Sequence, residues 1–246
     1  MELVKVEKLT KKYPKFFLDG VSFTMEEGRI MGFIGRNGAG KSTTLKSMLH
    51  MVHPDSGQVT CFGLDMDKQE ADIKQRIGFA GGVVDYYRKK KISQILDMTK
   101  RFYPNWDDKL CEKYMQMFSL DGDKTPSQLS EGMKVKLNLT MALSHKAELL
   151  ILDEPTSGLD PVSREELLEI FKHLKKQGVS ILFSTHITSD LEKCADDITY
   201  IREGRVLYTG SMDAFIAKEQ QAGRGNTLED IMVSYEKEAL HEKFVM

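Results

Sequence analysis

The stretch Gly35-Arg36-Asn37-Gly38-Ala39-Gly40-Lys41-Ser42 decides the fold expected for this chain. It fits the pattern G-x-x-x-x-G-K-[ST], whose glycines let the backbone curl until successive N–H groups point at phosphate oxygens. The short apolar run Arg29–Ile34 precedes it and is typical of a buried strand, and a helix is expected to begin near Lys41. A strand, a Gly-rich loop and a helix N-terminus form the context that this way of binding phosphate requires.

This loop predicts a site for ATP and Mg²⁺. We expect Lys41 to reach the β- and γ-phosphates and the hydroxyl of Ser42 to ligate Mg²⁺. A chance match in a chain of this length is roughly a one-in-a-hundred event, so an accidental Gly-rich turn is the weaker interpretation. The residues expected to contact the nucleotide here are Gly35, Arg36, Asn37, Gly38, Ala39, Gly40, Lys41, Ser42 and Thr43.

A pair of acids, Asp153 and Glu154, follows a second apolar strand at Glu148–Leu152. In isolation, two acids at a strand end more often cap a polar turn. Beside a phosphate loop they face the nucleotide, because ligands bind at the carboxyl ends of parallel strands. We therefore expect Asp153 to hold Mg²⁺, directly or through water, and Glu154 to orient or deprotonate the attacking water.

The segment Leu129-Ser130-Glu131-Gly132-Met133 precedes an apolar helix. Ser130 is a good N-cap, and the positive end of the helix attracts an anion. Taken alone, this segment would be an ordinary capped helix of the core. Its position just upstream of the strand that ends at Asp153 favours a role in the same site.

Strands alternate with helices along most of the chain, which indicates a mostly parallel sheet. The segment Tyr86–His145 instead predicts a block of amphipathic helices, and the tail Ser211–Met246 predicts charged helices with a capping box from Thr227 to Asp230. A helix is expected at Pro161–Gln177. Further strands are expected around Val4–Leu9, at Phe17–Met25 with a possible turn at Asp19-Gly20, and at Gln58–Phe62, Arg76–Phe79, Val179–Ser184, Ile198–Ile201 and Val206–Tyr208.

Composition excludes several classes of protein. The formal net charge of the 246 residues is -2, so no global basic field predicts a nucleic-acid partner. The three cysteines are scattered, which indicates free thiols in a reducing compartment, each a small buried hydrophobe. No signal peptide is apparent, and no stretch approaches the roughly 20 apolar residues of a membrane span. A membrane role would therefore require a partner.

Taken in order, these motifs resemble those of the ATP-binding cassette (ABC) family. The phosphate loop is similar to its Walker A motif, Leu149–Glu154 to Walker B, and Leu129–Met133 to a variant of its LSGGQ signature. Ser157-Gly158-Leu159-Asp160 resembles the D-loop, and His186 matches the switch histidine. The LSEGM-K pattern and the tail segment Thr227–Met232 resemble nucleotide-binding subunits of bacterial ABC-2-type exporters.

The resemblance implies an α/β fold with a phosphate-loop NTPase core and a mostly parallel sheet. An N-terminal antiparallel β subdomain and a helical subdomain complete this ABC ATPase fold. We expect one ABC ATPase domain over residues 1–246. Its core would span about 1–82 and 146–210, the helical subdomain about 83–145 and the C-terminal helical tail 211–246.

The resemblance also implies how the site is completed. In the family, two cassettes sandwich two ATPs, each between the phosphate loop of one subunit and the signature of the other. Ser130 and Gly132 would therefore touch the γ-phosphate held by the partner's Lys41. His186 would contact the γ-phosphate as a catalytic residue beside Glu154. Asp160 would contribute to the dimer contact while also capping the helix that begins at Pro161.

An aromatic side chain is expected to stack on the adenine. Tyr13 matches the family's position for this contact, after the first strand. Stacking of a base on an aromatic face would contribute roughly 1–3 kcal/mol. Phe16 or Phe17 could serve instead, and all three could belong to the core.

Partners and location follow from the resemblance. We expect a second ABC subunit, in a homo- or heterodimer, and a membrane permease subunit made as a separate chain. The protein would then be cytoplasmic and peripheral on the inner face of the cell membrane. The run Tyr86–Lys91 is either a solvated basic face or part of the docking site for the permease, and the aromatic segment Arg101–Trp106 is expected to help form that groove.

The chain departs from the family pattern at two places. A glutamine usually follows the strand that reads Ile77-Gly78-Phe79 here, and Gly82 occupies its position, with Asp85 as a candidate substitute. The signature carries Glu131 and Met133 where Gly and Gln are usual. Since both catalytic acids remain, we expect ATP hydrolysis, with altered coupling between transport and turnover.

Three other functions compete with an exporter ATPase. A soluble ABC-type ATPase acting on a macromolecular machine usually has two cassettes or long insertions, which this sequence lacks. A phosphotransferase would leave the signature segment and His186 unexplained. A regulatory ATP-binding subunit with weak hydrolysis is suggested by Gly82. The transported cargo is not readable from this chain, since the membrane subunit selects it.

Overall fold

The computed structural model describes residues 1–81 and 87–245, with side chains described through residue 238. Its larger sheet has six strands, and their order in the sheet is β10-β9-β3-β8-β7-β6. Five of them run parallel, and β10 pairs antiparallel with β9. The strands of this sheet are β3 (Ile30–Ile34), β6 (Ile77–Gly81), β7 (Leu149–Asp153), β8 (Ser180–Thr185), β9 (Asp197–Arg202) and β10 (Arg205–Ser211).

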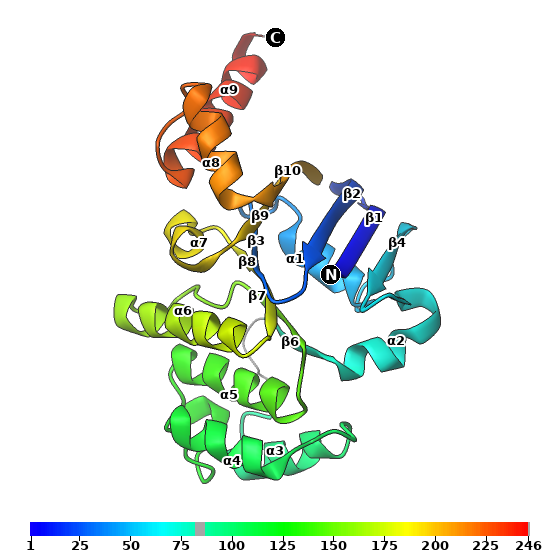
Figure 1. Cartoon of the computed structure of the whole chain (residues 1–246), viewed down its shortest axis with the longest axis vertical. Coiled ribbons are helices and arrows are strands. Elements are labelled where there is room, and N and C mark those ends of the chain that lie inside the picture. The colour runs from blue at the N-terminus through cyan, green and yellow to red at the C-terminus, as the bar shows by residue number, and fades with distance from the viewer. Residues whose placement is uncertain (82–86, 246) are drawn as a thin grey trace.

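The smaller sheet is antiparallel, with the order β2-β1-β4-β5, and it lies beside the larger one (Figure 1). The predicted turn at Asp19-Gly20 is wrong, because both residues lie inside β2. Gly20 has φ 61°, and the strand pairing skips a residue there, so the positive φ produces a bulge instead of a chain reversal. The strands are β1 (Glu2–Tyr13), β2 (Phe16–Glu26), β4 (Ser56–Cys61) and β5 (Leu64–Asp65).

Two hydrophobic cores share the central strand β3, which is buried along its whole length. Ile30 and Ile34 pack into the core on the side of the long helices, while Met31 and Phe33 pack into the core under the antiparallel sheet. A strand buried on both faces explains why this segment is continuously apolar in sequence. The phosphate loop that follows β3 is thus anchored to a strand that is buried on both faces.

The helices fall into three groups in Figure 1. The helices α3, α4 and α5 lie together at one end of the molecule, α8 and α9 lie at the other, and the rest cover the sheets. Within the described residues, no helix combines the length and apolar character needed to cross a bilayer. The helices are α1 (Lys41–Met48), α2 (Met66–Gln75), α3 (Ile92–Lys100), α4 (Asp108–Met117), α5 (Glu131–Ser144), α6 (Pro161–Lys176), α7 (Thr188–Cys194), α8 (Met212–Gln221) and α9 (Leu228–Val245), with a 3₁₀ turn at Pro126–Gln128.

Several local predictions are confirmed. The strands predicted at Ile198–Ile201 and Val206–Tyr208 are present as β9 and β10, and the chain turns between them at Glu203-Gly204, where both residues have positive φ. The capping box at the start of α9 is present, since the Asp230 amide donates to Thr227 Oγ1 and the Thr227 amide donates to the Asp230 carboxylate. All three cysteines are free and buried. The helices α2 and α7 were not predicted.

Candidate functional site

The phosphate loop leaves the N-terminus of α1 open. Gly38 and Gly40 have φ of 83° and 112°, in the left-handed region that favours glycine. Gly40 is also the N-cap of α1 and has no side chain with which to cap it. A Cβ on Gly35 would lie 2.3 Å from the backbone oxygen of Ile201, so the loop entrance accepts only glycine. The amides of the first helical turn are therefore available to an anion.

Lys41 is buried within the loop that it serves, with 5% of its surface exposed. Its Nζ donates to the backbone oxygen of Gly35 at 2.7 Å and to that of Arg36 at 3.3 Å. The same Nζ lies 3.0 Å from Oε1 of Glu154. The ammonium group is thus held over the loop, next to the second acid of the predicted pair.

The parallel order of the sheet brings the predicted metal-binding groups together. Oδ1 of Asp153, at the end of β7, accepts a hydrogen bond from Ser42 Oγ at 2.8 Å. A hydroxyl and a carboxylate are oxygen donors of the type that Mg²⁺ prefers, so these residues fit the predicted ion. Within the described residues no group of three or more His, Cys, Asp and Glu could hold a metal ion. Mg²⁺ usually takes one or two protein carboxylates together with substrate phosphates.

Asp153 and Glu154, at the carboxyl end of β7, are called the acid edge below. Glu154 connects this acid edge to His186. Oε2 of Glu154 lies 2.8 Å from Nδ1 of His186, which follows β8. The backbone of Glu154 has φ 52°, an uncommon conformation for a residue with a side chain. Its amide donates to both Oγ and the backbone oxygen of Ser184, at 2.9 and 3.2 Å. Ser184 was not singled out in the sequence, although a hydroxyl two residues before His186 was the available signal.

A cavity of about 560 Å³ lies over the phosphate loop. Tyr13, at the end of β1, is 40% exposed and lines it together with Phe16. Phe17 is not part of its lining, which narrows the predicted adenine contact to Tyr13 or Phe16. The full lining is Tyr13, Lys15, Phe16, Asn37, Gly38, Gly40, Lys41, Ser42, Thr43 and Glu154.

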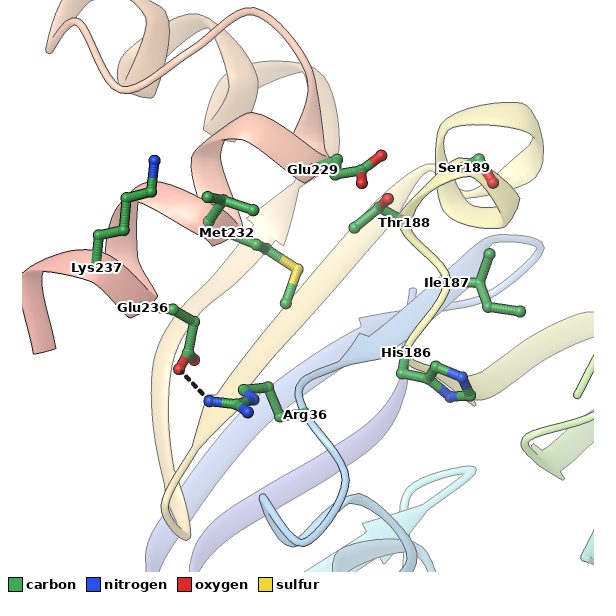
Figure 2. A pocket seen from close by; sticks show the side chains of 10 residues that line it. Arg36, His186, Ile187, Thr188, Ser189, Glu229, Met232, Glu236 and Lys237 are labelled. Carbon is green, nitrogen blue, oxygen red and sulfur yellow. Dashed lines mark hydrogen bonds and ion pairs between the residues drawn. The ribbon is translucent and has the colours of Figure 1, made fainter. Parts of the chain in front are cut away.

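Two residues of the phosphate loop, Arg36 and Ala39, do not line the cavity over the loop. The side chain of Arg36 turns towards α9, where its Nη1 lies 3.0 Å from Oε2 of Glu236 (Figure 2). It lines a second cavity, of about 560 Å³, between α9 and the start of α7. Ala39 is buried, and its backbone oxygen accepts from the amide of Gly204. The amide of Ala39 donates to the backbone oxygen of Arg36, and neither residue lines the cavity over the phosphate loop, so their predicted contact with the nucleotide stays a prediction.

The signature residues lie apart from the cavity over the phosphate loop. Ser130 caps α5, its Oγ accepting from the amide of Met133 at 3.3 Å. A Cβ on Gly132 would meet its nearest neighbour, Ser163 Cβ, at 3.5 Å, which is an ordinary contact. Packing within the chain therefore gives no reason for glycine at position 132.

Asp160 caps α6 with its carboxylate. Oδ1 accepts from the amides of Val162 and Ser163, at 3.0 and 3.1 Å, and Oδ2 accepts from the Ser163 hydroxyl at 2.6 Å. The hydroxyl bond, followed by the amide bonds, lowers the pKa of Asp160. The predicted contact with a second subunit stays a prediction. Gly82 and Asp85, which concern the missing glutamine, lie outside the described residues, as does Tyr86.

Comparison with known proteins adds independent findings. The family model described as ABC transporter matches residues 18–157, more than half of the 246-residue chain. The chain is 34% identical over 209 residues to the bacitracin transport ATP-binding protein BcrA of Bacillus licheniformis, an alignment covering 83% of this chain and 68% of the relative. It is 32% identical over 210 residues to the Nod factor export ATP-binding protein I of Burkholderia lata, covering 83% and 69%.

A solved structure agrees with these relatives. The structure of an ATP-binding subunit of an ABC transporter superposes on 94% of this chain and 98% of its own chain. The TM-score is 0.82 and the sequence identity 28%. The α/β fold with a phosphate-loop core, predicted above, is confirmed.

Proposed function

The chain belongs to the ATP-binding cassette (ABC) transporter family, and we propose that it closes with a second cassette around two Mg-ATP to drive export through a separate membrane subunit. It is an ATPase of the ATP-binding subunit type, and such subunits generally dimerise and pair with membrane permeases. Export is supported by the relative named for Nod factor export. The predicted division into core, helical subdomain and tail, and a place on the inner face of the membrane, belong to the same proposal.

One observation supports hydrolysis above the others: the contacts that join Lys41, Glu154 and His186. Lys41 and the loop amides would grip the phosphates, while Tyr13 would stack on the adenine. A phosphate oxygen in the cavity would compete with Glu154 for the Lys41 ammonium. Glu154 would then be released to orient the attacking water and accept its proton as the bond from the γ-phosphorus to the ADP oxygen breaks.

His186 would hold the γ-phosphate in line with that water, from its place 2.8 Å from Glu154. Ser42 and Asp153 would hold Mg²⁺. When bound, this ion neutralises charge that develops on the phosphate oxygens. Ser130 and Gly132 would touch the γ-phosphate of the second cassette, and Asp160 would lie at that interface.

The test of hydrolysis is the variant Glu154→Gln, which keeps the shape of the side chain and removes its basicity. We expect ATP turnover to fall about a thousandfold, while ATP drives the protein into a stable dimer detectable by size-exclusion chromatography. Glu148→Gln is the matched control, because Glu148 precedes the same strand and pairs with Arg76 at 2.6 Å. Wild-type turnover at the background level would contradict the proposal and favour a regulatory ATP-binding subunit.

The membrane partner is proposed to dock over a cavity of about 260 Å³ beside the end of β6. Its lining includes Phe79, Tyr103 and His145, and the ring of Tyr103 stacks on His145 at 3.9 Å. Nearby, the apolar residue Phe102 is 73% exposed. An exposed aromatic side chain beside this cavity favours an interface.

Docking can be tested by copurification of the membrane subunit from a detergent extract. We expect Phe102→Ser to reduce recovery of the permease while ATP binding stays normal. Leu207→Ser removes another exposed apolar side chain, on β10, and is expected to leave recovery unchanged. Full recovery with Phe102→Ser would refute docking at this cavity.

A further inference from the structure

We infer that Ser184 is a positioning residue for ATP hydrolysis, which sets Asp153 and Glu154 in register through one buried hydroxyl group. This inference rests on the proposed roles of those two acids. Ser184 lies on β8, and the pairing of β7 with β8 places it directly opposite Asp153. Its side chain is completely buried, so the hydroxyl has no contact with bulk water.

Both hydrogen-bonding functions of the hydroxyl are used on the acid edge. Ser184 Oγ donates to Oδ1 of Asp153 at 2.6 Å and accepts from the amide of Glu154 at 2.9 Å. A serine hydroxyl has a single hydrogen to donate, so its orientation is determined by these two partners. The side chain of one acid and the backbone of the next are thereby tied to the same atom.

The contact with Glu154 bears on the direction of the catalytic carboxylate. With φ 52°, Glu154 occupies a left-handed conformation, which is unfavourable for a residue with a Cβ. Such a conformation persists only where surrounding contacts hold it. Ser184 supplies two of these contacts, through Oγ and its backbone oxygen. Only the bond to Oγ can be removed by substitution of the side chain.

The contact with Asp153 selects which carboxylate oxygen is used. The hydroxyls of Ser42 and Ser184 both donate to Oδ1. Among the described residues no hydrogen bond reaches Oδ2, so that oxygen is left for the ion or for water. Loss of the Ser184 hydroxyl would let the carboxylate rotate, and the divalent-ion dependence of turnover would change with it.

A purely structural role would predict a different result, and β8 offers its own control. Ser180 lies on the same strand, is equally buried, and accepts a hydrogen bond from the amide of Gly28 at 2.8 Å. Ser180→Ala removes one buried hydrogen bond far along the strand from the acid edge. Ser184→Ala removes hydrogen bonds at that edge. A comparison of the two variants separates catalysis from stability.

The experiment measures kcat, KM for ATP, Mg²⁺ dependence and thermal unfolding for both variants and for Ser184→Thr, which retains a hydroxyl. We expect Ser184→Ala to lower kcat about 10- to 100-fold, with KM for ATP changed less than about twofold and a higher Mg²⁺ requirement. Ser180→Ala is expected to lower the unfolding temperature with kcat within about twofold of wild type. Ser184→Thr, where it folds, is expected to recover most of the lost kcat.

Two outcomes would overturn the inference: a folded Ser184→Ala protein with wild-type kcat, or equal losses of kcat in the two alanine variants. If Ser184→Ala does not fold, the test is folded Ser184→Thr, which keeps the hydroxyl. A kcat in that variant far below the wild-type value would count against the role of the hydroxyl. Glu154→Gln is measured in parallel. Wild-type turnover in that variant would instead refute the proposed role of Glu154, so the two failures are distinguishable.

Discussion

The phosphate loop with its acid edge and the start of α5 differ in what their residues touch. Lys41, Glu154 and His186 form a series of contacts within one chain, over a buried strand. Ser130, in contrast, accepts a hydrogen bond from its own helix. The space beside Gly132 could hold a methyl group, and no other atom of the chain occupies it. Contacts within the chain explain the residue types of the first region. Those of the second are explained by the proposed second cassette.

The largest expected effect comes from the first region. Lys41→Ala removes the buried ammonium from the loop, and we expect turnover to fall about a thousandfold because a charge on the phosphates loses its partner. Lys46→Ala, on the same helix α1, is the control and is expected to keep turnover near wild type. Normal turnover in Lys41→Ala would contradict the proposal that Lys41 of the phosphate loop binds the phosphates during hydrolysis.

Mixing experiments then test whether the two regions belong to different subunits. Gly132→Asp places a negative charge where the γ-phosphate is expected, so this variant is predicted to be inactive alone. In a mixture with Lys41→Ala, random pairing makes half of the dimers mixed, and each mixed dimer has one intact site of two. If each site acts independently, the mixture recovers about a quarter of wild-type turnover in a homodimeric protein. No recovery would contradict this form of sharing.

The sequence was sufficient to predict that the residues of the first region lie close together, because its motifs are local. The spacing from Gly35 to Ser42 and the adjacent acids specify chemistry that the order of parallel strands then brings together. Ser184 escaped notice because its contacts cross from β8 to β7, a pairing that the linear sequence does not display. Roles at Ser130 and Gly132 came from family resemblance, since their own contacts are those of an ordinary capped helix.

Secondary structure was missed where local signals are weak. The helix α2 buries only Met66 and Ile73 among its ten residues, so its apolar periodicity is poor. The helix α7 has seven residues, and its N-cap, Ile187, supplies no side-chain hydrogen bond. Tertiary packing stabilises both helices. At Gly20 the glycine does adopt the positive φ that a turn would require, but a positive φ can produce a bulge as well as a turn.

The far end of α5 provides the next largest effect. His145, the C-cap of α5, is buried, and this burial lowers its pKa to about 4 from an ordinary 6.5. The unfolded chain therefore binds a proton at higher pH than the folded protein does. The contribution of neutral His145 to the free energy of unfolding is fully present above about pH 6.5. It is lost as the pH falls towards 4, by up to about 3 kcal/mol.

Urea unfolding at pH 7.5 and pH 5 measures this effect. We expect His145→Phe, which retains an aromatic ring against Tyr103, to weaken the loss of stability between the two pH values. His53→Gln removes an exposed histidine and is expected to leave that loss unchanged. An unchanged pH dependence in His145→Phe would show that other groups cause it.

Gly132→Ala sharpens the contrast between stability and function in the second region. A glycine in a helix costs about 0.5–1 kcal/mol relative to alanine, and the neighbouring contacts leave space for the methyl group. The variant is therefore expected to be slightly more stable in urea unfolding. Its ATP turnover is expected to fall about tenfold, because the methyl group would crowd the γ-phosphate of the second cassette. Unchanged turnover would mean that Gly132 does not approach the nucleotide.

The smallest effect is expected at Arg36, where the phosphate loop meets the C-terminal helix. Its side chain is 68% exposed, and an exposed ion pair such as that with Glu236 contributes about 0–1 kcal/mol. Arg36→Ala is therefore expected to change urea stability little, and the affinity for ATP less than about twofold, because the guanidinium pairs with Glu236 and Arg36 does not line the cavity over the phosphate loop. Glu236→Gln, which breaks the pair from the other side, is the matched variant. A large loss of ATP affinity in Arg36→Ala alone would assign the guanidinium to the nucleotide and extend the first region to the surface that α9 covers.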